Sequence, residues 1–172
     1  MTDSEFRDAF QQHKDVLYRF AYRMTGSSSS AEDTVQECFL ALWRKPEVYR
    51  SSRGSLRAFL LGVTRNLILR RWRDQDQHQP LDEESFTCPP IDILSGKRDE
   101  AVAKAVQALP PLQREALILA EYEEMSLEQI AVATEAEVAA VKSRLHRARE
   151  NLRRMLSPWL ESKGALHGTK RS

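Results

Sequence analysis

The chain has 172 residues, and its 26 basic and 25 acidic side chains leave a net charge of +1. No apolar run approaches the roughly 20 residues that span a bilayer, and the opening MTDSEFRDAF is acidic and amphipathic, unlike a signal peptide. Its two cysteines, Cys38 and Cys88, lie far apart without a CxxC or Cys/His cluster, so we expect a soluble, cytoplasmic protein with free thiols and no metal site.

Apolar residues at helical spacing dominate the N-terminal half. A first amphipathic helix carries Phe6 through Met24 on its apolar face and is predicted to end at Gly26. A second helix is predicted to begin at Ser30, whose hydroxyl would cap it, and to end before Pro46. After a loop, a third helical stretch is predicted from its apolar stripe, which consists of Leu56, Leu60, Val63 and Leu67.

The middle of the chain loses this periodicity and separates two helical parts. Residues 76–96 contain Pro80, Pro89 and Pro90 together with several acids, which predicts an acidic flexible linker. No segment shows the alternation of a strand, so the fold class is all-α, with two small helical domains at residues 5–75 and 97–160. The second domain should contain helices over four segments: 101–109, 112–122, 126–134 with a capping box of Ser126 and Gln129, and about 138–156.

Charge is distributed in blocks along the chain. Residues 53–73 include six arginines and no acid, while residues 74–100 carry eight acids against two bases. From 142 to 154 the net charge is positive again, and Glu150 is the single acidic residue in that stretch. Two basic helices flanking an acidic connector are typical of a protein that binds nucleic acid at two places.

The last predicted helix has one apolar face and one basic edge. Lys142, His146 and Arg149 are one and two turns apart and therefore project along the same edge, with Arg153 beside them. A short helix, a tight turn and a basic helix are the parts of a helix-turn-helix, whose second helix reads the major groove. The alternative is a solvated basic face. The opposite, buried face is predicted to consist of Val138, Val141, Leu145, Ala148 and Leu152.

The segment SLEQIAVATEAEVAAVKSRLHRARENLR resembles the promoter-binding C-terminal domain of bacterial sigma factors, and the chain resembles their extracytoplasmic-function (ECF) group. The resemblance implies that the surface around residues 112–122 packs on the flap of the RNA polymerase β subunit. One departure is Thr134-Glu135, where the family has Leu-Gly. If Glu135 is left-handed, the cost is about 1 kcal/mol relative to glycine. The residues implied for the minus-35 element are Lys142, Ser143, Arg144, His146, Arg147 and Arg149.

Two further segments carry the same resemblance in the N-terminal half. AEDTVQECFLALWRK resembles the helix that docks on the coiled coil of the polymerase β′ clamp, which implies Asp33, Gln36 and Glu37 as contacts. GSLRAFLLGVTRNLILRRWR resembles the helices that capture the melted minus-10 element, with the loop at 49–53 lining a pocket for a flipped-out base. The residues implied there are Arg65, Asn66, Arg70, Arg71 and Arg73.

Several individual side chains also allow an interpretation of their role. Asparagine is a poor helix former, so Asn66 inside a helix suggests a base-reading role. Phe59 and Trp72 are interpreted as core residues, because aromatic rings at helical spacing usually are. The histidines have no partners at the spacing of a metal site or a catalytic triad and are expected on the surface or in the linker; they include His13, His78 and His167.

The expected function is therefore that of a sigma factor without catalysis or cofactor, which directs polymerase core to promoters and assists their opening. Its partners would be core polymerase, duplex promoter DNA and the non-template single strand. The resemblance also admits an anti-sigma protein, without indicating where it binds. The alternatives are a stand-alone helix-turn-helix regulator and, with no acidic metal cluster to support it, a nuclease.

Overall fold

A computed structural model of the chain describes residues 1–75 and 97–167, with side chains as far as residue 162. All regular structure within these ranges is helical, which confirms the predicted fold class. The predicted acidic linker at 76–96 lies outside the described residues, as do Cys88 and His78. No helix in the described part of the chain is both long and apolar enough to cross a bilayer.

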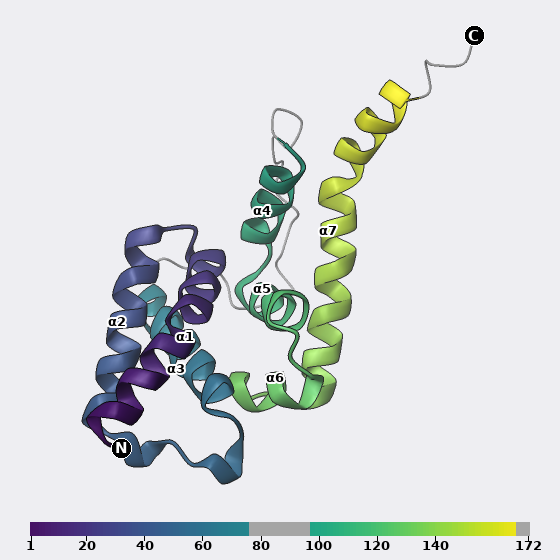
Figure 1. Cartoon of the computed structure of the whole chain (residues 1–172). Helices are drawn as coiled ribbons and strands as arrows, with labels where there is room; N and C mark the ends of the chain where they lie inside the picture. Colours follow the sequence, from purple (N-terminus) through teal and green to yellow (C-terminus); the bar gives the residue numbers. More distant parts are fainter. Residues whose placement is uncertain (76–96, 168–172) are drawn as a thin grey trace.

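The first three helices form one bundle (Figure 1). They are α1 (Asp3–Thr25), α2 (Ser28–Arg44) and α3 (Leu56–Asp74), and two short 3₁₀ turns, Pro46–Val48 and Ser51–Arg53, connect α2 to α3. Leu17 and Phe20 of α1, Cys38 of α2, and Leu60 and Ile68 of α3 are buried between the helices. Burying these side chains removes apolar surface from water, which is the main favourable contribution to packing the bundle.

Local chemistry sets the helix ends in this bundle. Gly26 takes the left-handed conformation, with φ 69°, that ends α1, as predicted. The N-cap of α2 is Ser27, whose hydroxyl accepts a hydrogen bond from the Ser30 backbone N–H at 3.2 Å. The prediction of Ser30 as the cap was wrong because four serines in a row each offer a suitable hydroxyl, and the chain leaves the left-handed Gly26 directly into Ser27.

His13 is buried, contrary to the expectation of a surface position. It follows Ala9 and precedes Leu17 at intervals of four, so it lies on the inner stripe of α1. Loss of hydration lowers the pKa of the imidazole, and the nearby positive charge of Arg57 lowers it further. His13 is therefore a neutral core residue at physiological pH.

The second bundle comprises α4 (Arg98–Ala108), α5 (Pro111–Leu117) with a π-helical turn at Ile118–Tyr122, α6 (Leu127–Thr134) and α7 (Val138–His167). The predicted capping box of Ser126 and Gln129 is present in full at the start of α6. Helix α7 continues through Pro158, past the predicted end near residue 156. It lies along α4, and Met155 is buried there, so packing extends the helix past a residue that usually ends one (Figure 1).

The face of α7 that packs inward is shorter at its start than predicted. Val141, Leu145 and Ala148 are buried and Leu152 is half-buried, but Val138 is exposed. Val138 is the first residue of α7, directly after the turn, where no neighbouring helix covers it. The buried amide of Asn151 donates to Gln113 Oε1 at 2.8 Å and thereby fixes α7 against α5.

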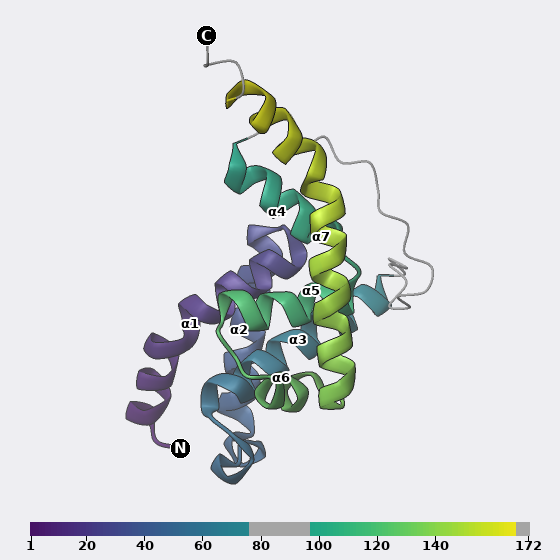
Figure 2. The same cartoon turned by 90° about the vertical axis from the view of Figure 1, so that its right-hand side faces the viewer.

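The two bundles are in direct contact. Helix α6 lies against α3, and α4 and α5 lie against α1, in both views (Figures 1 and 2). The buried guanidinium of Arg114 on α5 donates to the carbonyl of Met24 on α1 as well as to those of Gln107 and Leu109. Burial lowers the pKa of Arg114 to about 10. The described residues therefore share one continuous core across both halves of the sequence.

Candidate polymerase and nucleic-acid interfaces

The outer face of α2 presents the residues predicted to bind polymerase. Val35 and Phe39 face the core, which turns Asp33 and Gln36 outward to solvent. Glu37 is half-buried, because its carboxylate accepts from Arg70 at 2.7 Å and from Arg71 at 2.9 Å. The three predicted residues thus lie on one face of α2, with Glu37 also engaged by α3.

Two residues that sequence reasoning missed extend this face. Leu40 and Trp43 are 51% and 47% exposed, although large apolar side chains are usually covered. They follow Asp33 and Gln36 at an interval of seven, so they continue the same face, a spacing that could have identified them in the sequence. Exposed apolar side chains beside polar ones are typical of an interface core and rim. We call the set Asp33, Gln36, Glu37, Leu40 and Trp43 the α2 stripe.

The residues predicted to bind the minus-10 element all lie on α3, but they differ in accessibility. Arg65 is largely buried and forms a two-bond ion pair with Glu115 of α5, at 2.8 and 3.0 Å. Arg71 donates to Thr34 at 2.9 Å as well as to Glu37. Asn66 is exposed and accepts a hydrogen bond from Arg65 at 3.0 Å. The set Arg65, Asn66, Arg70, Arg71 and Arg73 is called the α3 face.

Glu115 has an unusual environment for a carboxylate. Its side chain is fully buried, and this loss of hydration raises the pKa of the carboxyl. The hydrogen bonds and charge of Arg65 act in the opposite direction, and the charge of Arg144 adds to them. A buried carboxylate with a bidentate arginine is a strong geometric constraint, because removing either partner leaves the other charged and unpaired.

A cavity of about 290 Å³ lies beside the α3 face. The 49–53 loop lines this cavity through Tyr49, Arg50 and Arg53, and Phe59 and Asn66 complete that side. Its role as a pocket for a base stays a prediction. Phe59 is half-buried with its ring 5.4 Å from that of Tyr49, which fits its interpretation as a packing residue. The opposite wall comes from the other bundle, from residues Val132, Ala133 and Glu135 of α6 and its C-cap.

The predicted minus-35 residues lie along the first four turns of α7. Lys142, Ser143, His146, Arg147 and Arg149 are exposed, and Arg144 is half-buried. Arg149 donates to Glu121 through Nε at 3.1 Å and through Nη2, and His146 lies 3.5 Å from Glu150. We call Lys142, Ser143, Arg144, His146, Arg147 and Arg149 the α7 edge.

The turn between α6 and α7 contains the left-handed residue whose cost was considered in the sequence analysis. Glu135 has φ 53° and ψ 41°, in the left-handed region that glycine enters at lowest cost. The Ala136 N–H donates to the Ala131 carbonyl at 3.0 Å, which satisfies the end of α6. The helix-turn-helix is therefore complete, with strain of about 1 kcal/mol at Glu135.

Fold and sites together define an all-helical protein with a helix-turn-helix in one half and an arginine-rich, aromatic-lined face in the other. Residues 9–78 match the Sigma-70 region 2 family and residues 99–152 match the Sigma-70 region 4 family. The chain belongs to the ECF group of RNA polymerase sigma factors, a family that initiates transcription and is not catalytic. Below, the two matched segments are called region 2 and region 4.

Named relatives support this assignment. The chain is 34% identical to the ECF sigma factor SigE of Mycolicibacterium smegmatis over 86% of its length, and it spans 60% of that protein. It is 32% identical to SigL of Mycobacterium tuberculosis strain Erdman over 86% of each chain. The structure is similar, with a TM-score of 0.68, 27% identity and coverage of 89% of this chain and 97% of the other, to the sigma factor RpoE from Bartonella quintana solved with the anti-sigma factor NepR.

Proposed function

We propose that this chain recruits core RNA polymerase through the α2 stripe, reads duplex DNA at the minus-35 position with the α7 edge, and holds the melted minus-10 strand on the α3 face. The observation that carries the proposal is the coexistence of these three surfaces on one chain, because a repressor has no use for the α2 stripe. The proposed place of action is the cytoplasm, where polymerase and chromosome meet.

The polymerase contact is supported by what the α2 stripe exposes. Asp33 and Gln36 point to solvent, and Leu40 and Trp43 supply the apolar area that an interface needs at its centre. Asp33 and Gln36 are the best residues to test, because Glu37 also binds Arg70 and Arg71 and its loss would disturb α3.

The test is co-purification with core polymerase. Asp33→Ala combined with Gln36→Ala should reduce recovery of the complex at least about tenfold, if each contact is an interface hot spot of 1 kcal/mol or more. Glu32→Ala, on the same helix turn but outside the stripe, is the matched control. Retained binding by the double variant, with an unchanged circular dichroism spectrum, would remove the α2 stripe from the polymerase interface.

The DNA contacts are supported by side-chain chemistry. On α7, arginine and lysine side chains can donate to guanine edges and to phosphates in a major groove. Beside the α3 face, Arg50 and Arg53 of the 49–53 loop provide phosphate contacts, and Tyr49 and Phe59 in the same cavity provide stacking surfaces for unpaired bases. Bond formation belongs to the polymerase, and nothing in this scheme asks for catalysis by the factor.

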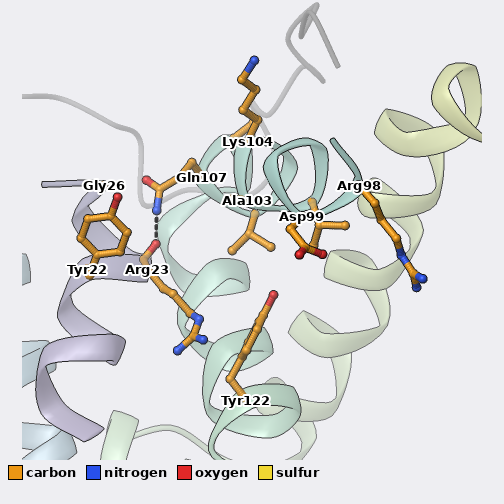
Figure 3. Close-up of a pocket in the computed structure, with 12 residues that line it drawn as sticks. Tyr22, Arg23, Gly26, Arg98, Asp99, Ala103, Lys104, Gln107 and Tyr122 are labelled. Atoms are coloured by element: carbon orange, nitrogen blue, oxygen red, sulfur yellow. Dashed lines mark hydrogen bonds between the residues drawn. The ribbon is translucent and has the colours of Figure 1, made fainter. Parts of the chain in front are cut away.

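An anti-sigma factor is proposed as a regulator, because the similar sigma factor from Bartonella quintana was solved in complex with one. A groove of about 920 Å³ between α1 and α4 is the proposed contact, since it joins the two regions (Figure 3). Tyr22 and Tyr122 offer apolar surface at its rim, and the guanidinium of Arg23 lies 4.0 Å from the Tyr122 ring. The positive charges of Arg23, Arg98 and Lys104 favour an acidic amphipathic helix as the partner.

A stand-alone helix-turn-helix regulator is the second candidate, because the α7 edge is accessible without polymerase. A gel shift of the purified protein on cognate promoter duplex separates the two. Tight sequence-specific binding without polymerase would support the regulator. Start-site selection that appears only when core polymerase is added would support the sigma factor.

A further inference from the structure

The apolar end of the α2 stripe is in contact with α1, the helix that lies beside α2 (Figure 1). Trp43 is 47% exposed, yet its ring lies against Phe6 in the first turn of α1, with the ring centroids 4.8 Å apart and the ring planes at 67°. We propose that Phe6 is a positioning residue for polymerase binding, which holds the Trp43 indole in the orientation that the α2 stripe presents. The inference rests on the proposed function of the α2 stripe and goes beyond it, because it assigns part of the polymerase site to a second helix.

Phe6 connects the exposed indole to the core of region 2. Its ring also contacts the ring of Phe39, with the centroids 6.1 Å apart and the planes at 88°, and Phe39 is 3% exposed. In such edge-on contacts the positive edge of one ring meets the negative face of the other, so each contact fixes an orientation as well as a distance. Trp43 is therefore oriented by a ring that a buried residue orients in turn.

The start of α1 is held in place by its own hydrogen bonds. The Glu5 N–H donates to the Thr2 hydroxyl at 3.2 Å, and the Thr2 N–H donates to the Glu5 carboxylate at 2.7 Å, which completes a capping box. The hydrogen bonds from Thr2 lower the pKa of the Glu5 carboxyl, so the box keeps its charged acceptor at physiological pH. Phe6 is the next residue, and a box that prevents fraying of this turn also holds Phe6 against Trp43.

A fixed orientation of Trp43 favours binding because of its entropy. Immobilising a side chain at an interface costs free energy of association, and a side chain that is already held in its bound orientation avoids most of that cost. Tryptophan is also among the residue types enriched in interface hot spots. Loss of Phe6 should therefore weaken polymerase binding through Trp43, without any contact between Phe6 and polymerase.

A purely structural role for Phe6 is the alternative, and Phe10 provides the comparison that separates the two roles. Both phenylalanines lie on α1, both are half-buried, and both rings contact Phe39, that of Phe10 at 4.9 Å. Among the ring contacts of the described residues, Trp43 pairs with Phe6 and not with Phe10. Loss of either phenylalanine removes apolar packing between α1 and α2, but loss of Phe6 also releases the indole.

The test is a double-mutant cycle on the affinity for core polymerase. Phe6→Ala should weaken binding about three- to tenfold in the otherwise native chain, and by less than about twofold in the Trp43→Ala background, because its effect passes through the indole. Phe6→Tyr keeps the ring and should keep the native affinity. Phe10→Ala is the matched control, which should lower thermal stability about as much as Phe6→Ala while it leaves the affinity within about twofold.

A second measurement follows the orientation of Trp43 directly. The chain has three tryptophans, so Trp72→Phe combined with Trp159→Phe leaves Trp43 as the single fluorescent indole. In that background, Phe6→Ala should lower the fluorescence anisotropy of Trp43 and increase its quenching by acrylamide, because the ring gains rotational freedom. Phe10→Ala should leave both quantities unchanged.

The capping box provides a variant that removes no ring, which keeps the inference testable if Phe6→Ala does not fold. Thr2→Ala combined with Glu5→Ala loosens the first turn of α1, so it should change the anisotropy of Trp43 and the affinity for polymerase in the same directions as Phe6→Ala, by smaller factors. Its effect on affinity should also disappear in the Trp43→Ala background.

Native affinity of Phe6→Ala, with a native circular dichroism spectrum, would overturn the positioning role. Equal weakening in the native and Trp43→Ala backgrounds, or equal weakening by Phe10→Ala, would also overturn it, since the effect would not then pass through the indole. The double variant of Asp33 and Gln36 separates this inference from the proposed function. If that variant loses polymerase and Phe6→Ala does not, the positioning role alone fails; if neither loses polymerase, the α2 stripe is not the interface.

Discussion

The two basic helices of this sigma factor have similar arginine content but differ in how deeply an arginine is held, since Arg65 of α3 is 11% exposed at its side chain and Arg149 of α7 is 52% exposed. On α3, Arg65 is held by Glu115 of region 4, and Arg70 and Arg71 are held by Glu37. On α7, most of the edge faces solvent, and Arg149 pairs with Glu121, whose carboxylate is itself half exposed. The comparison teaches that a block of positive charge in the sequence does not reveal how accessible its side chains are, because acidic neighbours in space hold some of them.

The largest expected effect is a loss of stability in region 4, which carries the exposed basic helix α7. Leu145→Ala deletes a buried side chain that holds α7 in place and should destabilise region 4 by about 2–5 kcal/mol. Chemical denaturation followed by circular dichroism measures this loss. Val138→Ala, at the exposed start of the same helix, should change stability by no more than about 0.5 kcal/mol. Equal stabilities of the two variants would contradict the assignment of the inner face of α7.

The next effect concerns the exposed edge alone. Arg149→Ala should weaken promoter binding by about 1–3 kcal/mol if this side chain reads a base. Transcription in vitro with core polymerase, on cognate promoter and on a minus-35 substitution series, measures both strength and base preference. Arg154→Ala, also exposed on α7 but outside the edge, serves as the control. An unchanged promoter profile in Arg149→Ala would remove Arg149 from the site.

A smaller effect is expected at the turn between α6 and α7. Glu135→Gly should stabilise the protein by about 1 kcal/mol, because glycine adopts a φ of 53° without the Cβ clash. Thermal unfolding gives the comparison. Glu128→Gly in α6 should instead destabilise by about 1 kcal/mol, since glycine is a poor helix former. Destabilisation by both substitutions would show that the Glu135 backbone is not strained in the native protein.

The smallest effect concerns the reactivity of Cys38, which is buried between α2 and α3 in region 2. The Cys38 thiol donates to the Leu60 carbonyl inside region 2, and burial raises the pKa of this thiol to about 11. Because the thiolate is the reactive form, alkylation of a Cys88→Ser variant should be slow at pH 8 and accelerate only as the pH approaches 11. Mass spectrometry over a pH series gives the profile. Fast labelling at the lower pH would contradict the burial of Cys38 in region 2.

Local features of the fold were predictable from the sequence to a large extent, and contacts between its halves were not. Spacing and turn chemistry predicted the capping box at Ser126 and the end of α1 at Gly26. They failed where several residues qualify, as in the serine run before α2, or where tertiary packing decides, as at Pro158 and His13. Helical spacing reports which residues share a face, and it carries no information about which other helix will cover that face.

The candidate sites were likewise predictable in part from the sequence. The motifs indicated which residues of α2, α3 and α7 should meet polymerase and DNA. The structure places those of α2 on one face and exposes most of those of α7, whereas on α3 Arg65 turns to α5 and Arg71 turns to α2. The pairing of Arg65 with Glu115 could not be predicted, because several acids of the second half carry the same charge. Leu40 and Trp43 could have been found from their interval of seven to Asp33 and Gln36, had exposed apolar positions been sought on the polar face of α2.

Under the proposed function, Glu37 would link the polymerase contact thermodynamically to the DNA contact. One carboxylate neutralises Arg70 and Arg71 and also lies on the α2 stripe, so a partner that engages it weakens its hold on both guanidinium groups. Linkage is reciprocal. A nucleic acid that binds these arginines would therefore free Glu37 and raise the affinity of the chain for polymerase by the same factor. Recruitment and strand capture would then favour each other through a single side chain.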